Sequence, residues 1–88
     1  NPFTFSVSPN PTNDDMVRIQ FNLPYVATLD YFITSLDGKL LDDGEIEGLQ
    51  VGKNEMNFSL ENAKEKIVIL TFILDNKFYA SQKIIRNQ

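Results

Sequence analysis

The sequence contains no cysteine and no histidine, and these two absences remove several kinds of chemistry. Without cysteine the chain can form neither a disulfide nor a thiolate metal site, although an oxidising compartment does not require disulfides. Without histidine it lacks the commonest general base, the commonest transition-metal ligand and the usual pH switch near neutrality. A Ser or Thr nucleophile therefore has no histidine partner. We expect no enzymatic activity, no cofactor and no metal site.

Positive charge and long apolar runs are also scarce. The 88 residues include 8 Lys and Arg against 12 Asp and Glu, which gives a net charge of -4. Nucleic acids and anionic lipids are bound by basic surfaces, so we expect neither as a partner. The longest apolar run, residues 67–74, has the length of a strand and is far shorter than the ~20 residues of a spanning helix. We therefore expect no membrane span.

The length of the chain indicates one domain, residues 1–88. A domain of this size buries only about 60–65% of the surface that its unfolded chain exposes, so its stability should be modest. The sequence begins at Asn1 rather than Met, and we interpret it as a piece of a larger protein. Any signal peptide would then lie upstream of it.

Alternation of apolar and polar residues is frequent, whereas a helical period is found at most over one turn at residues 60–66. The clearest example has Val17, Ile19 and Phe21 on one face and polar residues on the other. Asp37-Gly38 and Asp43-Gly44 each indicate a turn. The pattern predicts about seven short strands, including residues 3–8, 16–23, 27–35, 39–42, 56–60, 67–74 and 78–85. Such spacing is typical of an antiparallel β-sandwich or a small barrel.

Two sheets packed face to face would bury one side of each strand. We expect the inward set to be Phe5, Val7, Ile19, Phe21, Tyr31, Ile33, Phe58, Ile69 and Ile73. Phe32, Leu70 and Phe72 would then lie on an outer face. An apolar patch there would mark a partner site, unless loops or a neighbouring domain cover it.

Two oxygen-rich segments allow a calcium hypothesis. One contains Asp42, Asp43, Glu45 and Glu47, and the other is Asn13-Asp14-Asp15. Calcium needs several oxygens that converge on one point, and the spacing of the first segment does not match an EF-hand loop. The same residues can hold turns by bonding backbone N–H groups, and we favour that interpretation for both segments.

The order of motifs along the chain resembles one known family. Ser8-Pro9-Asn10-Pro11-Thr12 follows the first alternating stretch, and the next strand ends in Asn22-Leu23-Pro24. A third strand leads to Leu36-Asp37-Gly38-Lys39. The chain closes with an Asp75-Asn76-Lys77 turn and a strand carrying Lys83-Ile84-Ile85-Arg86. Over nearly its whole length the chain resembles the type A C-terminal sorting domain of the type IX (Por) secretion system.

The sequence departs from the family pattern where the penultimate strand begins. The family usually has Gly-x-Tyr there, whereas this chain has Lys66 and Val68.

The resemblance implies a fold, a function and a location. Such domains are Ig-like β-sandwiches at the C-terminus of secreted cargo in Gram-negative bacteria. They catalyse nothing, and they guide the upstream cargo domain from the periplasm through an outer-membrane translocon to the cell surface or the medium. A sortase-like protease then typically removes them. The expected partners are therefore the translocon and this protease.

The resemblance also implies which residues the partners would recognise. Pro9, Asn10 and Pro11 would form the first turn of the signal, and Gly38 and Lys39 would present a second turn. The terminal signal strand would carry Lys83, Ile84, Ile85 and Arg86.

Two other interpretations stay open. An Ig-like accessory or adhesion module would bind a glycan or another protein, wherever it stands in its parent protein. A structural spacer would neither bind a ligand nor direct export.

Overall fold

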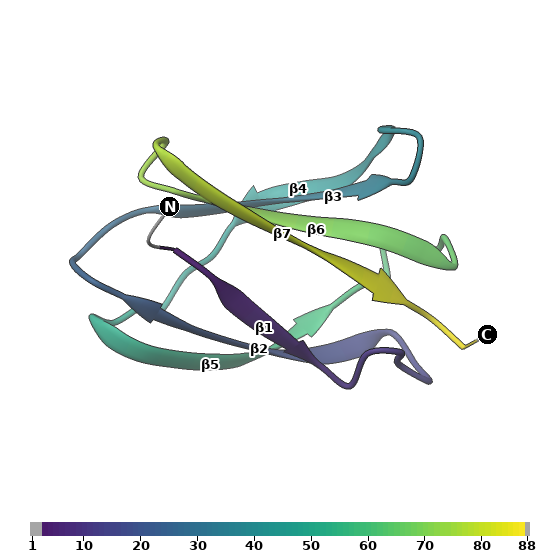
Figure 1. Ribbon diagram of the computed structural model, residues 1–88, viewed down its shortest axis with the longest axis horizontal. Helices are drawn as coiled ribbons and strands as arrows, with labels where there is room; N and C mark the ends of the chain where they lie inside the picture. The colour runs from purple at the N-terminus through teal and green to yellow at the C-terminus, as the bar shows by residue number, and fades with distance from the viewer. Residues whose placement is uncertain (1–2, 88) are drawn as a thin grey trace.

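A computed structural model describes residues 3–87 as two antiparallel sheets packed face to face (Figure 1). The strands are β1 (Phe5–Ser8), β2 (Met16–Leu23), β3 (Leu29–Ser35), β4 (Leu40–Glu45), β5 (Gly52–Ser59), β6 (Ile67–Leu74) and β7 (Phe78–Ile85). None of the described residues is helical. The predicted all-β, Ig-like antiparallel sandwich of about seven short strands is confirmed.

The strands are divided unequally between the two layers. The first sheet has the order β1-β2-β5 and the second has the order β4-β3-β6-β7. A hairpin joins β4 to β3, so β4 pairs within the second sheet and not with β5 of the first. The second sheet therefore has four strands and the first has three. β1 and β7 are edge strands of different sheets, and they contact each other. This contact closes one side of the sandwich.

The interior is built around aromatic rings from both sheets. Phe72 of β6 is completely buried, and its ring centroid lies 4.6 Å from that of Phe5 and 6.0 Å from that of Phe21. Phe58 meets the same ring edge to face at 6.2 Å. Aromatic pairs at these distances add to the gain from burial, so Phe72 is the centre of the core.

The expected orientation of β6 is wrong. Val68, Leu70, Phe72 and Leu74 are all fully buried, whereas Ile69 and Ile73 lie on the outer side and are only partly covered. Both faces of this strand are apolar, so alternation alone could not decide which face is inside. The register decides it, because Leu70 pairs with the buried Ile33 of β3.

The expected turn at Asp43-Gly44 is also wrong, because β4 runs through both residues. Gly44 pairs with Tyr31 of β3, and a Cβ atom built on Gly44 would lie 2.7 Å from Cε2 of that ring. Glycine is therefore required by the tyrosine that packs on it, and not by a turn. The other turn signal is confirmed, since Gly38 has a φ of 90° and joins β3 to β4.

Candidate functional site

Asn10 attaches the Pro-Asn-Pro segment to the last strand. Its side-chain Nδ2 donates a hydrogen bond to the carbonyl of Lys83 at 2.7 Å. Its Oδ1 accepts one from the backbone N–H of Ile85 at 3.0 Å. The peptide bonds before Pro9 and Pro11 are both cis. Through its two hydrogen bonds, the side-chain amide of Asn10 pairs with the free edge of β7 as the peptide group of a neighbouring strand would.

The chain continues this pairing through its backbone. The N–H of Thr12 donates to the carbonyl of Ile85 at 2.8 Å, and the N–H of Asn87 donates to the carbonyl of Thr12 at 2.9 Å. Thr12 and Arg86 therefore form a parallel bridge. The structure brings together two predicted signal elements, the Pro-Asn-Pro turn and the terminal strand.

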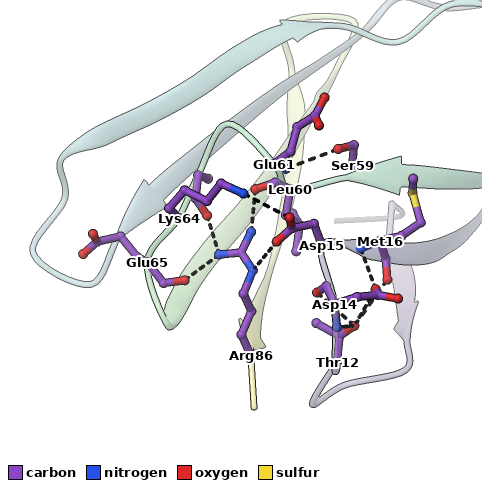
Figure 2. A network of polar contacts seen from close by, with 11 residues as sticks. Thr12, Asp14, Asp15, Met16, Ser59, Leu60, Glu61, Lys64, Glu65 and Arg86 are labelled. Carbon is purple, nitrogen blue, oxygen red and sulfur yellow. Dashed lines mark hydrogen bonds and ion pairs between the residues drawn. The ribbon is translucent and has the colours of Figure 1, made fainter. Parts of the chain in front are cut away.

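Arg86 lies at the centre of a polar network just beyond β7 (Figure 2). The residue is only 3% exposed, and its guanidinium donates to the carbonyls of Leu60, Ala63 and Glu65. Its Nε lies 3.3 Å from Oδ1 of Asp15, which precedes β2. The planar guanidinium has five donors in a fixed fork, so one side chain can bind three carbonyls and face a carboxylate.

Asp15 connects this arginine to a surface lysine. Its Oδ2 accepts a hydrogen bond from Nζ of Lys64 at 3.0 Å. The bond from Lys64 and the charges of Lys64 and Arg86 lower the pKa of Asp15 below 3.8, against a smaller opposing effect of burial. We call Asn10, Thr12, Asp15, residues 60–65 and Arg86 the terminal junction.

The oxygen-rich segment Asn13-Asp14-Asp15 forms a turn within this junction. The N–H of Met16 donates to Oδ1 of Asp14 at 2.8 Å, and the N–H of Asp14 donates to Oγ1 of the buried Thr12 at 3.3 Å. Oδ1 of Asn13 accepts a hydrogen bond from Asn87 at 3.1 Å. These oxygens bond to protein groups, in agreement with the turn interpretation.

The second acidic segment is spread along β4. Asp42 Oδ2 lies 3.4 Å from the hydroxyl of Tyr31, and burial together with the Asp42 charge raises the pKa of that tyrosine. Asp43 pairs with Phe32 and Glu45 pairs with Asp30, so the carboxylates follow the strand instead of converging. Across residues 3–87, no three acidic side chains form a group that could hold a metal ion.

The Gly38-Lys39 turn is not part of the terminal junction. Ser35 at the end of β3 pairs with Val68, and Val68 pairs with Ile84. The hairpin therefore lies at the same end of the second sheet as the junction, with β6 between them. Its turn is held by Ser35, whose hydroxyl bonds to the Asp37 carboxylate and accepts the N–H of Lys39. The Ser35 bond is the main cause of the lowered pKa of Asp37.

The four residues of the predicted terminal strand differ in exposure. Lys83 is exposed and Ile85 is half-buried, whereas Ile84 and Arg86 are buried. Pro9, Asn10 and Pro11 are exposed beside Lys83. A partner can therefore touch the Pro-Asn-Pro segment and Lys83 directly, while Ile84 and Arg86 hold that surface in place.

Sequence reasoning missed the roles of Asp15, Thr12 and the 60–65 loop. The position of Arg86 just after β7 could have indicated one of these roles, that of Asp15. Arg86 stands two positions after Ile84 and so continues the inward-facing side of the strand. An inward-facing arginine needs acceptors, and Asp15 at the start of another strand is a suitable one.

Comparison with known proteins does not identify a relative. No family model, no curated protein and no solved structure matches this chain. The described part of the chain also has no helix of the length and apolar character needed to cross a membrane.

Proposed function

We propose that this domain is a non-catalytic C-terminal sorting signal of the type IX secretion class. It directs an upstream cargo domain through the outer-membrane translocon, and protein partners recognise it in its folded state. It acts in the periplasm and then reaches the cell surface or the medium with its cargo. The proposal combines the order of sequence motifs with one structural observation, the pairing of Asn10 with β7.

This pairing supports a signal that is read only after folding. Asn10 and Lys83 are separated by 73 positions, yet they are joined by a hydrogen bond at the surface. An unfolded chain does not present them together, because closing so long a loop without the core is entropically unfavourable. A translocon component that binds both would select folded cargo domains over unfolded ones.

The experiment uses residues 1–88 fused to an inert reporter in a bacterium that carries the secretion system. The wild-type fusion should reach the surface or the medium. Asn10→Ala removes both bonds to β7 and should reduce export, whereas Asn57→Ala changes an exposed asparagine on β5 and should not. Lys83→Ala and Lys53→Ala form a second matched pair.

Two results would contradict the proposal. One is a wild-type fusion that stays in the periplasm. The other is equal export of Asn10→Ala and Lys83→Ala compared with their controls. Point variants are preferable to deletion of residues 83–88, because that deletion also removes the buried Ile84 and Arg86 and would unfold the domain.

A glycan-binding module is the second candidate, and a cavity favours it. A hollow of about 450 Å³ in the first sheet is lined by Thr4, Phe5, Ser6, Gln20, Phe21, Asn22 and Lys53. Hydroxyls and amides of this kind can bond to the hydroxyls of a sugar. This function predicts a ligand-dependent rise in melting temperature with an oligosaccharide panel, and Gln20→Ala should abolish the rise.

A further inference from the structure

The two outer faces of the sandwich differ in character. The face of the first sheet is polar, because Ser6, Gln20 and Glu55 form one cross-strand row and Arg18 and Asn57 belong to the next. A wet face of this kind is normal for an antiparallel sheet. The outer face of the second sheet instead carries several apolar side chains, so it is not the polar face that an antiparallel sheet normally turns to water.

The apolar residues of this second face come from three of its four strands. Isoleucines 67, 69 and 73 of β6 point outward, with Phe32 of β3 and Ile85 of β7 on either side. These side chains are partly exposed, and they are absent from the group packed against the core. No element of the described chain lies over this side of the sheet (Figure 1). We call these five residues the outer apolar face.

Charged and polar groups border the face unequally. The β4 margin carries the exposed carboxylates of Asp43 and Glu45, and the partly exposed Asp30 of β3 lies beside Glu45 in the row of Ile73. The β7 margin carries the exposed Lys83, in the row of Ile69, and Ser81, in the row of Thr71. One margin therefore offers hydrogen-bond acceptors, and the opposite margin offers a cation and a hydroxyl. The Ser81 Oγ lies 2.7 Å from Thr71 Oγ1, and it is able to donate across the interface when Thr71 is the donor of that bond.

From this pattern we propose that the outer apolar face binds a second copy of the same chain as a two-fold dimer. Two such faces can meet about an axis parallel to the strands or about one perpendicular to them. The parallel axis places the β4 margin of each copy against the β7 margin of the other. The perpendicular axis places β4 against β4, so that Asp43 and Glu45 face like charges. The charges therefore select the parallel axis.

The row positions agree with this arrangement. Asp43 is in the row of Phe32, Thr71 and Ser81, so it faces Ser81 of the other copy. Lys83 is in the next row, two residues or about 7 Å along the strand. The flexible four-carbon stem of lysine can reach across one row to Asp43. Each copy gives and receives this contact once, as an isologous interface requires.

The expected affinity is low. One face of a four-stranded sheet is at the small end of protein interfaces, so we expect a dissociation constant on the order of 10 µM. The pairing does not rest on the sorting proposal, because it requires neither the translocon nor the Pro-Asn-Pro segment. Lys83 is the one residue that both proposals use, and sedimentation of the isolated domain tests the pairing without any export.

Sedimentation velocity of the isolated domain from about 5 to about 500 µM tests the proposal. The wild type should shift toward twice its mass of 10.1 kDa as concentration rises. Thr71→Lys places a charge in the middle of the face and should keep the chain monomeric. Asn57→Lys makes a similar change on the polar face and should leave the shift unchanged. Circular dichroism checks that both variants fold.

A charge exchange tests the choice of axis. Lys83→Glu and Asp43→Lys should each weaken the dimer by roughly tenfold, and the double variant should restore it. Asp43→Lys combined with Lys53→Glu has the same net charge as the double variant but should not restore it. The proposal is wrong if the wild type is monomeric throughout, if Asn57→Lys disrupts as much as Thr71→Lys, or if the charge exchange restores nothing.

Discussion

Asp15 is a surface carboxylate held between two cations, and its ionisation is linked to folding. Its folded pKa lies below 3.8, chiefly because of the hydrogen bond from Lys64. A depressed pKa means that the stabilisation is fully present above the unfolded pKa, which is the ordinary value of 3.8, and is lost as the pH falls through the folded pKa. Asp15→Asn should therefore lower the melting temperature at about pH 7, and the difference from the wild type should shrink toward about pH 2.

Thermal unfolding followed by circular dichroism across this pH range measures the effect. Glu61→Gln is a suitable control, because it removes an exposed carboxylate that takes no part in the ion pairs of Asp15. A difference between Asp15→Asn and wild type that stays constant from neutral to acid pH would contradict the linkage.

Phe72 and Ile69 lie three residues apart on β6 and face opposite sides of the sheet. Phe72 is 0% exposed among other aromatic rings, so Phe72→Ala should destabilise the domain by about 3–5 kcal/mol. Ile69 lies on the outer face, and Ile69→Ala should have an effect of about 1 kcal/mol or less. Urea unfolding at low protein concentration distinguishes the two. A larger effect for Ile69→Ala than for Phe72→Ala would mean that β6 has the opposite orientation, with Ile69 inside.

At the scale of the element, some strands could be predicted fully from the sequence and others could not. In β2, Val17, Ile19 and Phe21 alternate with polar residues, so the strand, its inner face and its end before Pro24 were all predictable. In β6 both faces are apolar, so the strand was predictable but its orientation was not. Its orientation depends on pairing with β3, which is a tertiary property.

The candidate site shows the same limit. The Pro-Asn-Pro segment and the Lys83–Arg86 segment were each identified by resemblance, but nothing local in either one indicates that they touch. Their contact depends on the side chain of Asn10 replacing a strand at the edge of β7. A side-chain amide that substitutes for backbone leaves no periodic pattern in the sequence.

Asn10 should control the protection of one particular amide. The N–H of Ile85 donates to Oδ1 of Asn10, so Asn10→Ala should expose this amide to water and accelerate its hydrogen exchange. The N–H of Arg86 donates to the carbonyl of Lys66 and should remain protected. Exchange measured by NMR at the two neighbouring amides provides an internal control. Unchanged exchange at Ile85 would show that Asn10 does not cover this edge.

At the scale of the whole molecule, Arg86 connects parts of the chain that the two sheets leave separate. Its backbone pairs with Thr12, and its side chain binds the 60–65 loop between β5 and β6 and faces Asp15 before β2. β2 belongs to the first sheet, whereas β6 and β7 belong to the second. The junction therefore ties both layers together at one end of the sandwich.

Arg86→Leu should accordingly destabilise the entire domain. The side chain is 4% exposed, and its loss removes a donor from three carbonyls, of which that of Leu60 keeps the N–H of Ala63, and leaves Asp15 without one of its cations. Breaking a buried charged network costs about 3–5 kcal/mol, out of the ~5–10 kcal/mol expected for a small domain.

Arg18→Leu is the matched control, because Arg18 pairs with Glu55 at the surface with 52% of its side chain exposed. Such surface pairs contribute about 0–1 kcal/mol. Urea unfolding should show a large loss for Arg86→Leu, a small one for Arg18→Leu and an intermediate one for Arg86→Lys, which keeps the charge without the fork. Similar midpoints for the two leucine variants would mean that the layers hold together without the junction.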